Sequence, residues 1–548
     1  MLRKLTAMIS GENTGTQTIV GWISGFAGVV FTRLFLEQFS NQSPLGIIES
    51  DPKTFTHVFL FFLAITVSIS LIVSLFTKQK GNKVITLALC GLSIIWLAPI
   101  LDLLISGGGI SSMAYMFETH SAILFNFFTF FGPIKTPGIT QGLHIELFLS
   151  LCAIGWYVWN KRKNILFGIG AALVSYIFIF TALSLPGIIF TISHPFATEK
   201  GSPAVVSFMN ETILNSTIHG NALHNTLAYK STSRLLDIGF DTIISQLFFL
   251  ISFITILSWS WYTHKDTFKK ILRNARIERV LSYMSLLALG ALYARAMTPV
   301  VFIWADWMGL TVLTLSWFSA WMYAVHTNDL YDIDIDTISN PNRPLPKKEL
   351  SLQTMRDIGF GWLLLSLVGA YIVGYYPFFM SIVFTSAYYV YSAPPLRLKR
   401  VPMLSSFLIS LACLATILAG FFFLSPDKML ATFPTLLVIG IIVVFTLSSN
   451  FRDLKDIEGD RKAGIQTIPV IFGAYGRQVV GALLALGFLF VPIFLSFYTL
   501  YLFAIPAAII GYKLCVRQPY KEKYLFVLYF VFYAITILLT FFLLSLLK

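Results

Sequence analysis

Long runs of apolar residues, separated by short polar segments, dominate the sequence. Most runs approach the roughly 20 residues that a helix needs to cross the hydrocarbon core of a bilayer. The pattern predicts six spans in the first half of the chain, at residues 18–36, 56–77, 83–104, 141–159, 164–190 and 241–262. Nine more follow in the second half, at residues 281–303, 308–328, 355–375, 377–392, 402–423, 428–449, 473–493, 497–514 and 524–547. We therefore predict an all-α fold, a polytopic transmembrane helical bundle of about fifteen spans.

Composition supports a protein embedded in lipid. Of the 548 residues, 56% are hydrophobic and 12% are charged, whereas a soluble domain carries about 25% charged residues. The mean hydropathy is +0.76. The four cysteines stand singly in or beside apolar segments, which is neither a metal motif nor a disulfide framework.

The net charge of +13 is explained by topology. Basic residues form short clusters between apolar runs, the pattern typical of cytoplasmic loops. With Met1 inside and Lys548 outside, one alternation places these clusters on the cytoplasmic side: Lys78–Lys83, Lys161–Lys163, Lys265–Arg279, Arg397–Arg400, Arg452–Arg477 and Lys513–Lys523. We therefore predict an integral multi-pass protein of the cell membrane, surrounded by membrane lipids and with no nucleic acid partner.

The basic stretch Lys265–Arg279 divides the sequence into two predicted domains. Residues 1–264 form an N-terminal multi-span domain of unknown function, with a polar outer loop near 191–240, and residues 265–548 form a nine-helix domain. Ionisable residues of the first domain collect on the inferred outer side. We interpret them as surface residues at the ends of spans, where polar groups cost little: Asp102, Glu118, His120, His144 and Glu146.

Two acidic segments follow spans of the second domain. The first reads Asn328-Asp329-Leu-Tyr-Asp332-Ile-Asp334-Ile-Asp336, and the second reads Arg452-Asp453-Leu-Lys-Asp456-Ile-Glu458-Gly-Asp460-Arg461. In both, carboxylates recur at positions i, i+3 and i+7, which lie within roughly 60° of one another on a helix. Asp334 and Glu458 fall on the far side of this acidic stripe. The spacing predicts two matching stripes at the inner ends of two spans.

Clustered carboxylates repel one another and are stabilised by cations. Mg²⁺ prefers oxygen ligands and typically binds one or two carboxylates together with phosphate oxygens of a substrate. Two facing stripes would hold a diphosphate through such ions, which neutralise the charge that develops when the diphosphate departs. The alternative, that these are solvated loop charges, explains a single acidic helix end better than two matching ones.

Basic residues accompany the acids. Arg343 follows the first segment, and the loop Tyr388–Arg400 carries Tyr391, Arg397 and Lys399. Arginine matches phosphate oxygens with two parallel hydrogen bonds, and lysine supplies a point charge. A cluster that only anchors the preceding span on the cytoplasmic side is the alternative interpretation of this loop.

These motifs resemble the UbiA superfamily of intramembrane prenyltransferases. The first segment matches the family pattern N-D-x-x-D-x-x-x-D, the second matches D-x-x-D-x-x-G-D, and the Tyr-Ser-x-Pro-Pro-x-Arg-x-Lys-Arg loop is similar to members that make chlorophyll, archaeal ether lipids or quinones. The resemblance covers about residues 275–548. It implies that Asn328, Asp332, Asp456 and Asp460 hold Mg²⁺ and diphosphate, and that Asp329, Asp336 and Asp453 complete the acidic lining. The substrate-binding candidates are Arg343, Tyr391, Arg397, Lys399, Arg452 and Arg461.

The resemblance implies Mg²⁺-dependent transfer of an isoprenyl group from its diphosphate to a lipophilic or aromatic acceptor, at a site facing the cytoplasm. The chain departs from many members by carrying Arg452 and Ser448 where they have Lys and Tyr, and by lacking an Arg-Pro near Arg279–Met284. Acceptor identity therefore stays open. Two alternatives also stay open: transfer of phosphoribosyl to a lipid phosphate, and a non-enzymatic carrier whose acidic loops gate cations.

Overall fold

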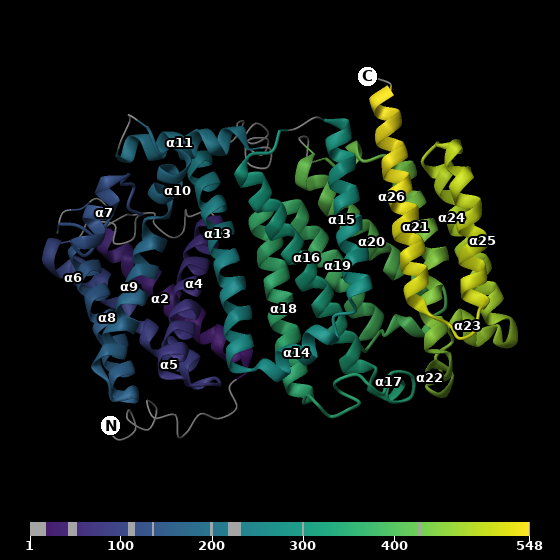
Figure 1. Ribbon diagram of the computed structural model, residues 1–548, viewed down its shortest axis with the longest axis horizontal. Helices are drawn as coiled ribbons and strands as arrows, with labels where there is room; N and C mark the ends of the chain where they lie inside the picture. The colour runs from purple at the N-terminus through teal and green to yellow at the C-terminus, as the bar shows by residue number, and fades with distance from the viewer. Residues whose placement is uncertain are drawn as a thin grey trace. The chain divides into compact units, whose positions relative to one another are not determined.

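The computed structural model describes residues 18–41, 52–107, 115–133, 136, 138–197, 201–216, 232–298, 301–425 and 429–546. The secondary structure of these residues is helical throughout, as the sequence predicted. The chain divides into two compact units, residues 1–268 and 269–548 (Figure 1). The predicted locations of Met1 and Lys548 lie outside the described residues.

The first unit is built around α4. Its helices are α2 (Ile19–Asn41), α4 (Pro52–Thr77), α5 (Lys83–Leu92), η1 (Ser93–Trp96), α6 (Leu97–Ser106), α7 (Ser121–Phe128), α8 (Gln141–Arg162), α9 (Ile165–Leu183), α10 (Leu185–Ser193), α11 (Ser202–Asn215) and α13 (Thr232–Thr263). α4 packs against α13 and also contacts α5, α8 and α9. Fourteen residues of α4 are buried, so this span is shielded from lipid on several sides.

Two of the acids that we interpreted as surface residues are buried instead. The Glu146 carboxylate pairs with Arg33 Nη1 at 3.1 Å and accepts a hydrogen bond from the Ala98 amide at 3.0 Å. Asp102 accepts hydrogen bonds from Thr140 Oγ1 at 2.6 Å and from the Gly142 amide at 2.8 Å, at the start of α8. The interpretation as surface residues was wrong for both, because helical spacing gives the direction of a side chain but not the neighbour that packs against it.

The second unit is a bundle centred on α16 and α20. α14 (Lys265–Arg273) lies at the division between the units. The other helices are α15 (Ile277–Met297), α16 (Trp304–Tyr331), α17 (Ile333–Ser339), α18 (Leu352–Val373), α19 (Tyr375–Ser392), η2 (Leu398–Arg400), α20 (Leu404–Leu424), η3 (Leu430–Thr432), α21 (Thr435–Ser448), η4 (Ser449–Lys455), α22 (Ile457–Lys462), α23 (Ile468–Ile471), η5 (Gly473–Tyr475), α24 (Gly476–Phe494), η6 (Tyr498–Leu500), α25 (Tyr501–Val516) and α26 (Glu522–Leu546). α20 packs against α15, α19 and α21.

A pair of glycines sets the distance between α15 and α20. A Cβ atom added to Gly290 would lie 1.9 Å from the Ile417 carbonyl oxygen, and one added to Gly420 would lie 1.9 Å from the Leu287 carbonyl oxygen. Small residues at a helix crossing let two backbones approach closely, which is a common device in membrane bundles. Substitution of either glycine would force the two helices apart.

Fourteen helices of the described part of the chain are long and apolar enough to cross a membrane, six in the first unit and eight in the second. The remaining predicted span, 377–392, is α19, which is helical but less apolar because it contains five tyrosines. It still packs between α16, α18 and α20. The predicted bundle is therefore present.

Candidate active site

Both acidic segments have the same local structure. α16 ends at Tyr331 and the short α17 begins at Ile333, so Asp332, with φ −113° and ψ 18°, lies between them. η4 ends at Lys455 and α22 begins at Ile457, so Asp456, with φ −106° and ψ 9°, lies between them. In each case the amide four residues later, that of Asp336 or Asp460, donates to the aspartate carbonyl at 2.8 Å. The shared face was worked out for a regular helix, whereas in the structure the helix breaks at the middle aspartate of each segment.

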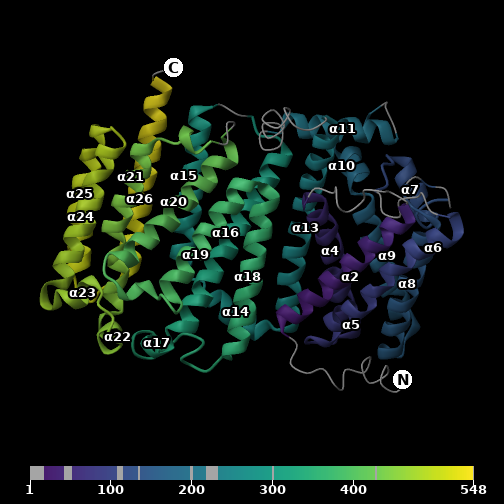
Figure 2. The same ribbon diagram turned by 180° about the vertical axis from the view of Figure 1, so that it is seen from behind.

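The two short helices α17 and α22 contact each other at one end of the second unit (Figures 1 and 2). Gly459 makes this contact possible. A Cβ atom added at Gly459 would lie 2.3 Å from Ser339 Oγ, 3.0 Å from Ile335 Cγ2 and 3.2 Å from the Ile335 carbonyl oxygen. The glycine of the second motif therefore has a steric reason for its place, since a larger residue would separate α17 from α22.

Asn340 joins the two acidic segments directly. Its Nδ2 donates to Asp336 Oδ1 at 3.1 Å and to Asp456 Oδ1 at 3.0 Å. These two carboxylates are 120 positions apart in the sequence, and one amide group holds them at a fixed separation. The predicted meeting of the two stripes is thus visible in the structure as a shared hydrogen-bond donor.

A cavity of about 70 Å³ lies between the segments. Six of the seven predicted catalytic residues border it: Asn328, Asp332, Asp336, Asp453, Asp456 and Asp460. Asp334 and Glu458 are exposed and do not border it. Their position agrees with the prediction that they point away from the acidic stripe.

Asp329 is the predicted lining residue that does not border the cavity. It is 2% exposed and is surrounded by donors. Arg276 Nη2 lies 2.5 Å from Asp329 Oδ1, Arg343 Nη1 lies 3.3 Å from the same oxygen, and Asn274 Nδ2 donates to Oδ2 at 2.5 Å. Its contacts tie the residues before α15 to the end of α16.

Three of the predicted basic residues contact carboxylates of the first acidic segment. Lys399 Nζ forms an ion pair with Asp332, and Arg397 Nη2 lies 3.1 Å from the same Asp332 Oδ1. Arg343 forms an ion pair with Asp336. Lys399 and Arg343 border the cavity, whereas Arg397 does not, and Arg461 is exposed and also lies outside the lining.

Sequence reasoning missed three other basic residues that border the cavity: Arg276, Arg279 and Lys455. Arg276 has φ +55°, in the left-handed region that non-glycine residues seldom adopt. Its guanidinium also donates to Asn328 Oδ1 at 3.3 Å, while Trp321 Nε1 donates to the carbonyl of Ala275 at 2.8 Å and fixes the preceding peptide. Arg276 and Arg279 lie in the basic stretch Lys265–Arg279, which we explained by topology and by the division into domains, so neither carried a site assignment.

Arg279 and Lys455 share one acid. Arg279 Nη2 lies 2.7 Å from Glu522 Oε1, and Lys455 Nζ lies 2.9 Å from Glu522 Oε2. Glu522 opens the last helix, far from both motifs in the sequence. No spacing rule links it to them, because the pairing depends on how α26 packs against α15.

The side of the cavity that faces the bundle is aromatic. Trp321, Tyr388 and Tyr391 border it together with Arg452. Arg452 Nη1 lies 3.5 Å from Tyr388 Oη, which is also hydrogen bonded to the Tyr283 hydroxyl. An apolar group attached to a ligand in the cavity would lie against these rings.

The electrostatics favour an anionic ligand together with a metal ion. Five carboxylates and six basic groups are among the described lining residues. Burial, followed by the neighbouring Asp453 and Asp456, raises the pKa of Asp460 to about 8. Burial also raises the pKa of Asp336 to about 6, against the opposing effect of Arg343. These carboxylates are crowded, so a divalent cation would stabilise their ionised forms.

The donor set suits Mg²⁺ that takes part of its ligands from a substrate. Within the described ranges, no three His, Cys, Asp or Glu residues are placed to hold a metal ion. Lys399 and Arg343 form ion pairs with Asp332 and Asp336, two carboxylates that the prediction assigns to the site. A hard cation that needs only one or two carboxylates and takes its other ligands from phosphate fits this arrangement.

Comparison with known proteins agrees with this geometry. Residues 283–536 match the model of the UbiA prenyltransferase family. The digeranylgeranylglyceryl phosphate synthase of Sulfolobus acidocaldarius is 30% identical over 206 residues, which cover 36% of this chain and 70% of the relative. The chain belongs to the UbiA prenyltransferase family. As a UbiA-type prenyltransferase it is an integral, multi-pass membrane enzyme.

Other UbiA relatives act on different molecules. A naringenin 8-dimethylallyltransferase of Sophora flavescens is 33% identical over 187 residues, covering 30% of this chain and 45% of the relative. A solved structure described as a UbiA homolog from Archaeoglobus fulgidus bound to GPP and Mg²⁺ is 21% identical, with a TM-score of 0.41, and covers 50% of this chain and 99% of that one. The UbiA match begins after Arg276 and Arg279, and it leaves the first unit unassigned.

Proposed function

We propose that the second unit transfers an isoprenyl group from an isoprenyl diphosphate to a lipophilic or aromatic acceptor, with Mg²⁺ as cofactor. The observation that carries this proposal is the Asn340 amide, which holds Asp336 of the first acidic segment and Asp456 of the second at 3.1 and 3.0 Å. Two acidic segments fixed around one cavity can hold both ends of a diphosphate through metal ions.

Asn328, Asp332, Asp456 and Asp460 are the residues that would hold Mg²⁺. The bound ion supplies charge stabilisation for the departing diphosphate. Lys399 and Arg343 then serve the phosphate oxygens, because each already points its cationic group at the acidic side of the cavity. Arg276 and Arg279 add positive charge at the same cavity.

The aromatic side of the cavity is where the isoprenyl group would lie. When the bond to the diphosphate weakens, positive charge develops on the allylic carbon. The rings of Trp321, Tyr388 and Tyr391 border this region, and aromatic faces attract cations. The buried rings of Trp321 and Tyr388 also exclude water, which would otherwise capture the allylic group. Arg452, tied to the Tyr388 hydroxyl, is a positioning residue for this wall.

We place the active site at the cytoplasmic face of the cell membrane. Basic residues lie around the acidic segments, at Arg397–Arg400 and Arg452–Arg477, and basic loops stay in the cytoplasm. Isoprenyl diphosphates carry several negative charges and are water-soluble at one end. Delivery from the cytoplasm avoids moving that charge through the bilayer.

Substitution of the two central aspartates tests the proposal. Asp332→Ala and Asp456→Ala should each lower Mg²⁺-dependent diphosphate release by roughly a thousandfold, because each removes a metal ligand and several kcal/mol of barrier lowering. Asp334→Ala is the matched control, since Asp334 belongs to the same segment but is exposed. Substrate candidates are isoprenyl diphosphates with aromatic and lipid acceptors. Activity above a tenth of wild type in both variants would contradict the assignment.

A further inference from the structure

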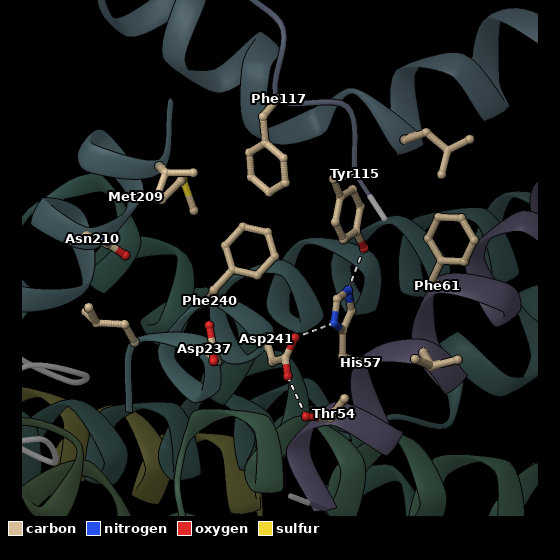
Figure 3. Close-up of a pocket in the computed structure, with 14 residues that line it drawn as sticks. Thr54, His57, Phe61, Tyr115, Phe117, Met209, Asn210, Asp237, Phe240 and Asp241 are labelled. Carbon is tan, nitrogen blue, oxygen red and sulfur yellow. Dashed lines mark hydrogen bonds and ion pairs between the residues drawn. The ribbon is translucent and has the colours of Figure 1, made fainter. Parts of the chain in front are cut away.

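The first unit contains a cavity that the prenyltransferase reaction does not use. It encloses about 370 Å³ and is shown in Figure 3. α4 contributes Thr54, His57 and Phe61, at the spacing i, i+3 and i+7 that places them on one helix face. α13 contributes Asp237, Phe240 and Asp241, and the rest of the wall comes from α9, α11 and the segment before α7. This volume is within the range of small-molecule sites.

A hydrogen-bonded chain runs along one wall of the cavity (Figure 3). Thr54 Oγ1 donates to Asp241 Oδ2 at 2.6 Å, and His57 Nδ1 lies 2.7 Å from Asp241 Oδ1. With the proton on Nδ1, His57 Nε2 accepts from the Tyr115 hydroxyl at 2.5 Å. Burial raises the pKa of Tyr115 well above its ordinary value, which keeps this hydroxyl a donor. The chain fixes the Asp241 carboxylate in place.

A second carboxylate lies four residues earlier on α13 and has no such partner. Asp237 borders the same cavity, is exposed, and forms no hydrogen bond or ion pair with another described residue. The Asp241 carboxylate interacts with it electrostatically and carries like charge. Two carboxylates one helical turn apart repel each other, so a cation between or beside them would lower the energy of the site.

The other lining residues are aromatic or apolar. The ring centroids of Tyr115 and Phe240 are 5.8 Å apart, and those of Phe117 and Phe240 are 5.9 Å apart. No lysine or arginine occurs among the described lining residues, which disfavours a phosphate or carboxylate ligand. The described residues also provide no group of three His, Cys, Asp or Glu for a metal ion. Among the ligand classes considered, the lining therefore favours an organic cation, whose apolar part can contact the aromatic rings.

We propose that this cavity is a binding site for an organic ammonium compound, with Asp237 and Asp241 facing the charge and the rings of Tyr115, Phe117 and Phe240 contacting its body. Aromatic rings combined with carboxylates are the groups that recognise amines and quaternary ammonium ions. The ligand is either a soluble amine or the ammonium headgroup of a membrane lipid.

The cavity lies at the end of the first unit away from its basic loops. His57 is 20 residues before the end of α4 at Thr77, which corresponds to about 30 Å of helix, the thickness of the hydrocarbon core. Lys78, Lys80 and Lys83 follow that end of α4. By the positive-inside rule the cavity then opens toward the outer face of the membrane.

Binding of benzyltrimethylammonium to the full-length protein tests this proposal. The protein is kept in a maltoside detergent, which contains no ammonium group, and binding is measured by isothermal titration calorimetry. We expect benzyltrimethylammonium to bind and 3-phenylpropanol, which is neutral, to bind at least about tenfold more weakly. The anion 3-phenylpropanoate should not bind. Equal binding of all three compounds, or no binding of the cation, would overturn the proposal.

Two charge-removing variants locate the site. Asp237→Asn should weaken binding of the cation by roughly tenfold or more, whereas Glu211→Gln should change it by less than about twofold. Glu211 is exposed on α11 and adjacent to Asn210, which lines the cavity, but does not line it itself. Equal effects of the two variants would show that general surface electrostatics, and not this cavity, accounts for the binding, which would contradict the proposal. If Asp237→Asn is poorly folded, Phe240→Leu provides the second test, and unchanged affinity there would contradict the proposal.

A competition experiment separates the two sources of the ligand. Phosphatidylethanolamine, which carries an ammonium group, is added to the detergent-solubilised protein, and phosphatidylglycerol, which carries none, is the control. Displacement of benzyltrimethylammonium by the first lipid alone assigns the site to a lipid headgroup. Displacement by neither lipid assigns it to a soluble amine. Equal displacement by both lipids would contradict recognition of the ammonium group.

Discussion

Substitution of Gly459 by alanine tests whether the contact between α17 and α22 sets the spacing of the acidic residues. The added Cβ atom would lie 2.3 Å from Ser339 Oγ and 3.2 Å from the carbonyl oxygen of Ile335. Ser339 Oγ has no hydrogen-bond partner among the described residues, so its side chain can rotate away at little cost. The Ile335 carbonyl belongs to the backbone of α17 and can yield only if α17 moves.

A displacement of α17 away from α22 by several tenths of an ångström would stretch the 3.0 Å hydrogen bond from Asn340 to Asp456, because Asn340 follows α17 and Asp456 precedes α22. Misplacement by 1 Å can cost about a hundredfold in rate, so we expect Gly459→Ala to weaken binding of a diphosphate by roughly tenfold. The assay is titration of geranyl thiolodiphosphate in the presence of Mg²⁺. It needs no acceptor, and the compound reacts slowly.

Two controls make the result specific. The double variant Gly459→Ala with Ser339→Ala removes the 2.3 Å clash but keeps the contacts with Ile335, so it should recover only part of the affinity. Gly91→Ala, in α5, adds a Cβ that meets nothing within 4 Å and should bind like wild type. Wild-type affinity of a well-folded Gly459→Ala variant would refute the reasoning.

Three further predictions concern the same unit. Mg²⁺ affinity, measured by titration with the diphosphate analogue present, should rise between pH 6 and pH 8. Asp460 is a proposed Mg²⁺ ligand whose raised pKa (about 8) means that it is protonated at lower pH and must lose its proton to bind the ion; a flat profile would exclude this role. Arg276→Gln should weaken analogue binding by roughly tenfold through loss of its contacts with Asn328 and Asp329, whereas Arg273→Gln, whose exposed side chain pairs with Glu349, should have little effect. A fragment of residues 269–548 should retain Mg²⁺-dependent binding of the analogue, since the lining residues all lie within it; a folded fragment that cannot bind would show that the first unit completes the site.

Hydropathy located the spans because crossing a bilayer requires an apolar helix of about 20 residues. Of the fifteen predicted spans, as far as the structure describes them, only α19 falls short of that hydropathy, because of its tyrosines. The matching aspartate spacing predicted that the two acidic segments would meet, and Asn340 shows the meeting. The breaks at Asp332 and Asp456 were not predictable from that spacing, because a continuous helix satisfies it equally well. Arg276 and Glu522 were missed for another reason. Their partners are determined by packing between segments that are distant in the sequence, and a single sequence does not reveal such packing.

In the first unit, too, residue pairs that are distant in the sequence could not be predicted from it. His57 lies inside an apolar run and Asp241 at the edge of another, 184 positions away. Neither residue belongs to a motif, so no local pattern connects them. Glu146 was interpreted as a surface residue for a similar reason, since its partner Arg33 lies 113 positions earlier. Pairs of this kind become visible only when helices far apart in the sequence are packed together.

The ion pairs of Lys399 with Asp332 and of Arg343 with Asp336 have a thermodynamic consequence. These pairs compensate the acidic charge in the absence of a ligand, so an arriving metal ion must compete with a tethered cation and should bind weakly by itself. Under the proposed function, a diphosphate would offer the displaced Lys399 and Arg343 new partners, and the two ligands would therefore assist each other. Linkage requires this assistance to be reciprocal. If the diphosphate raises the affinity for Mg²⁺ by a given factor, then removal of Mg²⁺ by a chelator must lower the affinity for the diphosphate by the same factor. Because the tethered cations remain in place, chelation should leave the protein folded.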